Sequence, residues 1–209
     1  MRQLSIVALL VLTFSMLARA QQSKSTSVRD ILINQPDYIA TETLTSAFMG
    51  HGFSVSYKTA KRMDCYRRQS DTQITYSCLH QPDMIFYPRT KEYRQEARPE
   101  GTGPDALFIS DVQTFARTRN DVDYRLVGTE KFGEQECFKI EAQVTYKVAS
   151  PGYREFTFVF YVAKNLRNLV IGVTVTGKET YASSSLHDIR LDFPDRLFKK
   201  PGGYRPKRP

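Results

Sequence analysis

The sequence predicts an α+β protein whose main element is a strongly curved antiparallel β half-barrel, with a few helices covering its concave face. Two observations lead to this fold class. Apolar and polar residues alternate with period two along most of the chain, and only two short stretches have helical spacing. Strands joined by short turns form an antiparallel meander, and a long sheet must curl, close or be covered. We expect the order helix, about five strands, helix, about five strands.

The N-terminus has the three parts of a secretory signal peptide. Arg2 is a short basic region, Leu4–Leu17 is a mostly apolar run, and Ala18-Arg19-Ala20 fits the small-x-small cleavage rule. The apolar run is shorter than the roughly 20 residues that a membrane-spanning helix needs. We expect residues 1–20 to be removed and the protein to be exported, to a periplasm or outside the cell.

The remaining chain predicts one binding domain over residues 21–204, followed by a basic flexible tail at residues 205–209. The tail belongs to a cluster of positive charge formed by Lys199, Lys200, Arg205, Lys207 and Arg208. Such a cluster attracts anionic membrane surfaces by about 1 kcal/mol per residue, or is a solvated tail that aids solubility. Both interpretations stay open.

The first helix is predicted directly after Ser27. Ser27 and Asp30 have the spacing of a capping box, with Asp in place of Glu, and apolar residues follow at helical spacing before Pro36. A second helix is predicted over Asp105–Arg117, after Gly103-Pro104-Asp105. This helix is either a movable lid or a fixed packing element.

Strands are predicted where the alternation is clearest, at Phe53–Lys58, Ile74–Ser77 and Phe138–Val144. Two other runs, Phe156–Val162 and Leu169–Val175, are apolar on both faces. Both of their faces must be covered, unless one lines an apolar space.

Aromatic and aliphatic residues of these segments are candidates to line a ligand cavity between sheet and helices; the alternative is a packed core. An apolar cavity is enough to hold an acyl chain, because each buried CH₂ contributes about 0.8 kcal/mol. The candidate lining residues are Phe53, Val55, Tyr57, Tyr76, Phe86, Phe108, Val112, Phe115, Phe138, Ile140, Phe158 and Phe160.

Two cysteines flank a predicted hairpin. If its turn centres on Asp71-Thr72, Cys65 lies opposite Cys78, at a separation that a disulfide can bridge after a small adjustment. The alternative is three buried free thiols, and Cys137 is left over in either case.

Catalytic and metal-binding motifs are absent from the sequence. The three histidines, His51, His80 and His187, have no metal-ligand spacing, and no G-x-S-x-G motif occurs. Ser183–Ser185 precedes His187 and Asp188, but neighbours on a strand point to alternate faces, so they do not predict a triad. We expect no metal, no cofactor and no enzyme activity. Nucleic acid is a poor partner for an exported chain without a recognised binding module.

Four segments in order resemble the LolA/LolB-like superfamily of periplasmic lipoprotein carriers and outer-membrane lipoprotein-sorting proteins. They are Pro82–Tyr93 (PDMIFYPRTKEY), the helix after Gly103-Pro104-Asp105, Leu126–Ala142 (LVGTEKFGEQECFKIEA) and Phe193–Tyr204 (FPDRLFKKPGGY). The resemblance covers about Val28 to Tyr204. The chain departs from the receptor type of this superfamily because it lacks a lipobox cysteine.

The resemblance implies a LolA-like open curved sheet with a helical lid over a hydrophobic cavity, and a function in lipid binding or lipoprotein transport without catalysis. Its ligand would be the acyl chains of a lipid or lipoprotein. The resemblance also implies a strand arginine that holds the lid, for which Arg67 and Arg68 are the candidates. The alternative function is a periplasmic protein-interaction or sensory module of the same fold, which has an envelope protein as partner and no lipid ligand.

Overall fold

The computed structural model describes residues 27–48, 51–97, 108–147, 153–178 and 180–207. The predicted signal peptide and the Gly103-Pro104-Asp105 turn lie outside these residues. None of the helices in the described ranges is long and apolar enough to cross a membrane.

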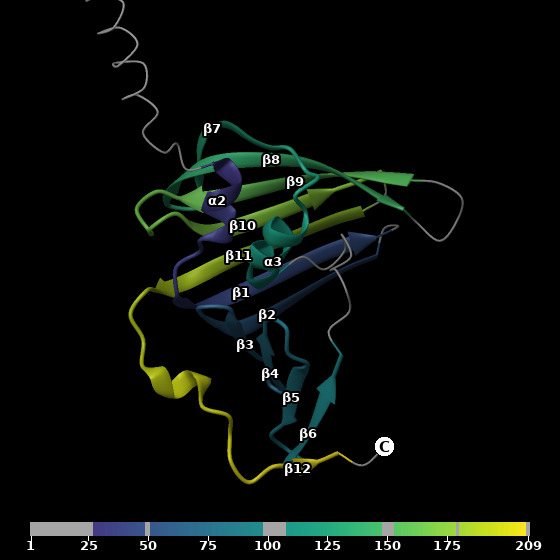
Figure 1. Ribbon diagram of the computed structural model, residues 1–209, viewed down its shortest axis with the longest axis vertical. Coiled ribbons are helices and arrows are strands. Elements are labelled where there is room, and N and C mark those ends of the chain that lie inside the picture. The colour runs from purple at the N-terminus through teal and green to yellow at the C-terminus, as the bar shows by residue number, and fades with distance from the viewer. Residues whose placement is uncertain (1–26, 49–50, 98–107, 148–152, 179, 208–209) are drawn as a thin grey trace, which may run out of the picture.

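The strands in the described residues all belong to one open sheet of twelve strands, which is not closed into a barrel (Figure 1). The predicted fold class, an antiparallel sheet with few helices, is confirmed. The sheet order is β12-β6-β5-β4-β3-β2-β1-β11-β10-β9-β8-β7, and only the contact of β12 with β6 is parallel. Along the chain the strands are β1 (Tyr38–Phe48), β2 (His51–Arg62), β3 (Cys65–Gln69), β4 (Ile74–Cys78), β5 (Asp83–Tyr87), β6 (Glu92–Glu96), β7 (Tyr124–Phe132), β8 (Gln135–Lys147), β9 (Tyr153–Ala163), β10 (Leu169–Thr176), β11 (Thr180–Arg190) and β12 (Arg205–Pro206).

The sheet consists of two meanders joined at one place. Strands β1 to β6 pair in chain order, and strands β7 to β11 do the same. The long antiparallel pairing of β1 with β11 unites them; Leu44, for example, lies opposite Ser184. Residues directly opposite each other share a face of the sheet, so this pairing continues each face from one meander to the other.

Both helices lie on the same face of the sheet (Figure 1). Helix α2 (Val28–Ile33) begins with the predicted capping box, in which Ser27 Oγ accepts from the Asp30 N–H and the Asp30 carboxylate accepts from the Ser27 N–H. Helix α3 (Ile109–Thr118) begins four residues later than predicted, and Phe108 is its extended N-cap. Phe108 leaves the helix because its ring packs between Tyr57 and Arg68.

The C-terminal segment runs from the end of β11 to the edge of the sheet beside β6 (Figure 1). It contains a 3₁₀-helix, η2 (Asp195–Phe198). We predicted a flexible tail from residue 205, but Arg205 and Pro206 form β12 beside β6. The Arg205 N–H donates to the Lys91 carbonyl and the Tyr204 ring packs edge-on to Phe86, so backbone pairing and an aromatic anchor hold this end.

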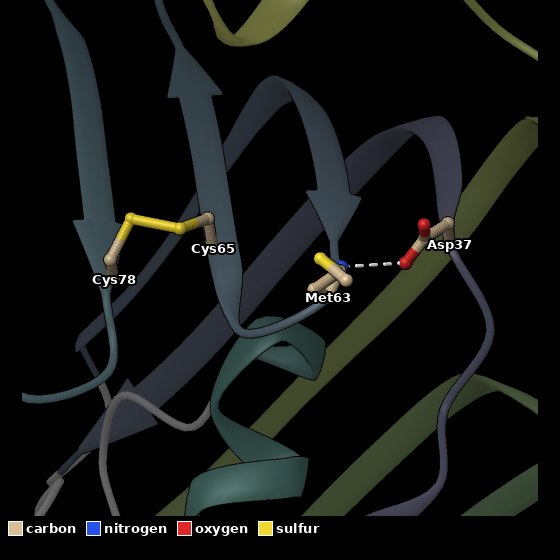
Figure 2. The surroundings of a disulfide bond; sticks show 4 residues. All are labelled: Asp37, Met63, Cys65 and Cys78. Atoms are coloured by element: carbon tan, nitrogen blue, oxygen red, sulfur yellow. Dashed lines mark hydrogen bonds between the residues drawn. A yellow bond between two sulfur atoms is a disulfide. The ribbon is translucent and has the colours of Figure 1, made fainter. Parts of the chain in front are cut away.

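A disulfide joins Cys65 to Cys78 across the β3–β4 hairpin (Figure 2). The two residues are opposite each other in the register predicted from the Asp71-Thr72 turn. Beside it, the Met63 N–H donates to Asp37 Oδ1 at 2.7 Å, which ties the β2–β3 turn to the start of β1. Cys137 is a buried free thiol.

Loss of the disulfide is expected to destabilise the fold. The bridge closes a loop with a sequence separation of 13 residues, for which chain entropy predicts about 3 kcal/mol. A reductant should therefore lower the urea midpoint of the wild type, and the double variant Cys65→Ser/Cys78→Ser should have the lowered midpoint without reductant. The same reductant should leave the double variant unchanged; equal midpoints for wild type and variant would contradict the expected role.

Candidate functional site

The face of the sheet beneath the helices is apolar on β8 to β10 and mixed on β1 and β2, where Glu42, Thr59 and Lys61 are buried beside apolar side chains. Strand pairing aligns one row of inward side chains over six strands: Val55, Leu44, Ser184, Val173, Phe160 and Ile140. Helix α3 covers this face. Its Phe115 ring stacks on Phe158 with the centroids 4.8 Å apart, and Val112 is fully buried.

The predicted lining residues of α3, β8 and β9 are packed together here. Ile140, Phe158, Phe160, Val112 and Phe115 belong to one core cluster and are at most 4% exposed. Phe138 packs at the margin of this cluster, with the Lys164 ammonium 4.9 Å from its ring centroid. The space between the sheet and α3 is occupied by these side chains.

The predicted lining residues of β2 lie on the same face but nearer its open end. Phe53 is 57% exposed, and Val55 is partly buried. Tyr57 packs edge-on to Phe108, with ring centroids 5.7 Å apart. Tyr57 and Phe108, together with Arg68, line a hollow of about 180 Å³ beside the start of α3.

Tyr76 and Phe86 lie on the other face of the sheet. Tyr76 is opposite Arg67 and Phe86 is opposite Ile74, and these positions face away from the helices. The C-terminal segment covers them: the Tyr76 hydroxyl donates to the Lys199 carbonyl at 3.3 Å, and Tyr204 packs on Phe86. The sequence predicted these two residues in the same lining as Phe53 and Tyr57, whereas the strand register separates the two groups by the thickness of the sheet.

Arg68 is the strand arginine that contacts helix α3. Its Nη2 donates to Ser110 Oγ and lies 3.4 Å from Asp111 Oδ1, and its guanidinium stacks on the Phe108 ring at 3.7 Å. These three contacts hold the first turn of α3 and its N-cap. Arg67, the other candidate, points to the opposite face, where it donates to Tyr76 Oη and Gln69 Oε1.

Glu42 is a second polar anchor for the start of α3. It lies on β1 within the apolar face and is fully buried. Its Oε1 accepts from the Ile109 N–H at 2.7 Å and from Ser184 Oγ at 2.8 Å, while its Oε2 has no hydrogen-bond partner in the described part of the chain. Burial raises the pKa of this carboxyl, and this effect outweighs the attraction of Arg68 and the two hydrogen bonds.

Other polar contacts hold the far end of α3. Arg29 of helix α2 donates to the Ala116 and Arg117 carbonyls at 2.8 and 3.1 Å, which satisfies acceptors at the C-terminal end of α3. Arg117 pairs with Asp64 in the β2–β3 turn at 2.9 Å. Both ends of α3 are thus attached by polar groups, and its middle by apolar packing and by the Tyr66 hydroxyl, which donates to Gln113 Oε1 at 3.0 Å.

The sequence analysis missed Glu42 and left Arg68 unassigned. A signal for Glu42 was present: it falls between Ala40 and Leu44 in the inward half of a period-two pattern, and a charged residue at such a position is unusual. No local signal identified Ser110 and Asp111 as the partners of Arg68, because α3 is placed by tertiary packing.

A larger hollow of about 420 Å³ lies on the face away from the helices, where side chains of β1, β2, β3 and β11 meet Leu197 of η2. On the same side Ser185 Oγ and His187 Nε2 are 2.9 Å apart and exposed. In the described ranges, no group of three His, Cys, Asp or Glu residues is arranged to hold a metal ion.

No protein-family model and no curated protein sequence matches this chain. Its structure is similar to the LolA superfamily protein NE2245 from Nitrosomonas europaea, with 12% identity and a TM-score of 0.45 over 86% of this chain and 97% of that one. It is also similar to LprF from Mycobacterium bovis, with 8% identity and a TM-score of 0.39 over 79% of this chain and 93% of that one. A third similar structure is the lipoprotein LppX from Mycobacterium tuberculosis, with 8% identity and a TM-score of 0.34 over 72% of this chain and 86% of that one.

The raised pKa of Glu42 predicts a pH-dependent effect of the variant Glu42→Gln. Between the ordinary carboxyl pKa near 4.5 and the higher pKa of the folded state, the folded protein binds one more proton than the unfolded chain, so ionisation of Glu42 destabilises the wild type as pH rises. The stability of Glu42→Gln relative to wild type should therefore grow with pH in that window, by at most about 1.4 kcal/mol per pH unit. Urea unfolding of both proteins from pH 4 to 8 measures this difference; a pH-independent difference would show that Glu42 does not titrate in this way.

Proposed function

We propose that the protein is an exported, non-enzymatic carrier that binds an acyl chain of a lipid or lipoprotein between the curved sheet and helix α3. The observation that supports this proposal is the attachment of α3: apolar residues of the helix cover a largely apolar sheet face, while buried polar groups hold the ends of the helix. In this proposal the helix is a lid that moves as a unit, and no covalent chemistry is needed.

The energetics favour exchange between helix and ligand. If α3 moved away, Phe158, Phe160 and Val173 would lose their cover. An acyl chain buried in their place contributes about 0.8 kcal/mol per CH₂, so a chain of about 16 carbons compensates for the lost packing of Val112 and Phe115. The hollow beside Tyr57 and Phe108 is the entry point in this proposal, because it adjoins the end of α3 that Arg68 holds.

The polar anchor makes the closed state marginal. Arg68 and Glu42 are taken out of water to hold α3, and the desolvation of buried charges offsets most of what their contacts contribute. Weak net anchoring is what a lid requires, since a wholly apolar contact would hold the helix more firmly.

Export is part of the proposal and is supported by two features. The sequence of residues 1–20 has the pattern of a signal peptide, and the Cys65–Cys78 disulfide is typical of an oxidising compartment. A periplasm is the location that we propose.

A second candidate function is a protein-interaction or sensory module without a lipid. One observation favours it: the sheet face is filled by the protein's own side chains, with Phe115 stacked on Phe158. Native mass spectrometry of the protein purified from its own cells separates the two candidates. A co-purifying lipid mass, or uptake of a fluorescent fatty acid, supports the carrier. A lipid-free domain that takes up no fatty acid and retains an envelope protein supports the module.

Removal of the arginine anchor should speed ligand entry. Arg68→Ala deletes the contacts with Ser110, Asp111 and Phe108. The loss of a hydrogen bond to a charged group costs about 1.5 kcal/mol. The state in which α3 has moved away from the sheet should therefore become about tenfold more populated. Stopped-flow fluorescence with a labelled 16-carbon fatty acid measures the association rate. Arg67→Ala is the matched control, because the neighbouring arginine faces the other side of the sheet. An unchanged rate in Arg68→Ala, or the same increase in Arg67→Ala, would exclude the anchor role.

A further inference from the structure

The 420 Å³ hollow on the face away from the helices has the composition of a binding site. Its floor is apolar and small: Ala60 lies in the centre, with Ile39 beside it and Leu197 of η2 forming one wall. Small residues among long ones leave a depression in the sheet surface, and this volume falls in the range of small-molecule sites.

Basic side chains surround this floor. Lys58, Arg67 and Arg190 come from β2, β3 and β11, and Asp188 is the only acidic residue among those that line the hollow. Arg67 is already oriented by Tyr76 and Gln69. In the described part of the chain, Lys58 and Arg190 make no ion pair and no side-chain hydrogen bond, so both are free to bind an anion.

A bulge in β11 and the attached C-terminal segment together build the hollow. Opposite Ile39 to Thr41 the register of β1 with β11 shifts, so β11 carries a bulge that brings both Asp188 and Arg190 to the hollow. Asp188 is engaged there by Thr41, whose hydroxyl donates to Oδ2 at 3.3 Å. The wall at Leu197 is fixed by the ion pair of Arg62 with Asp195 and by the hydrogen bond from Tyr76 to the Lys199 carbonyl.

We propose that this hollow binds an organic phosphate, with the phosphate between Lys58, Arg67 and Arg190 and an apolar part against Ile39, Ala60 and Leu197. Arginine forks and a lysine point charge are the groups that bind phosphate oxygens best. A phospholipid headgroup and a soluble phosphate ester share this chemistry. The site is on the opposite side of the sheet from α3 and does not depend on the proposed carrier function.

Isothermal titration calorimetry of the folded protein tests the proposal with three probes: inorganic phosphate, glycerol 3-phosphate and monomeric dihexanoyl phosphatidic acid. We expect binding that weakens as salt is raised. Lys58→Gln/Arg190→Gln should lower the affinity at least tenfold. Ala60→Leu, which fills the floor without changing charge, should also lower the affinity for the two organic probes, provided that circular dichroism shows it folded.

The matched control is Lys131→Gln/Arg154→Gln, which removes the same charge from exposed positions on β7 and β9. Tightest binding of the dihexanoyl lipid assigns the site to a headgroup, and equal binding of glycerol 3-phosphate assigns it to a soluble ester. The proposal is overturned if no organic phosphate binds, or if the control variant loses as much affinity as Lys58→Gln/Arg190→Gln. Lipid binding that is unaffected by both Lys58→Gln/Arg190→Gln and Ala60→Leu would belong to the space beneath α3. That result would also overturn the proposal.

Discussion

The pairing of β1 with β11 is the constraint on which the rest of the structure depends. It joins two meanders that are each formed from local hairpins, and it places Ser184 beside Glu42, 142 residues away in the sequence. Because closure over such a distance is entropically costly, we expect this contact to form late, after the local hairpins.

The helix-covered face combines apolar packing with a few buried polar groups. Glu42 and Arg68 contact α3 from neighbouring parts of the sheet, and neither is fully satisfied: in the described residues Glu42 Oε2 and Arg68 Nε have no hydrogen-bond partner. An apolar pair at these positions would pack at lower cost. Glu42 and Arg68 keep charged groups at the start of the short helix α3. Their weak net contribution links the packing of this face to the proposed movement of α3.

The two faces of the sheet have different chemistry. The face beneath α2 and α3 is mostly apolar with a few buried polar groups, whereas the opposite face carries Lys58, Arg67 and Arg190 around a small apolar floor. The C-terminal segment belongs to the second face, since its Leu197 completes the hollow and its Tyr204 covers Phe86. A sheet that is covered by helices on one side and by a single extended segment on the other has room for a distinct site on each.

The sequence by itself determined the features that depend on neighbours in the chain. The capping box at Ser27, the register of Cys65 with Cys78 and the alternation that makes most strands all follow from local spacing. Only the tertiary structure decided which face each strand turns toward the helices. Period two separates the two sides of one strand, but it does not say which side meets the inward side of another strand. Tyr76 and Phe86 therefore lie on the opposite face from Tyr57, Arg68 rather than Arg67 meets α3, and the chain from residue 205 adds a strand where a flexible tail was predicted.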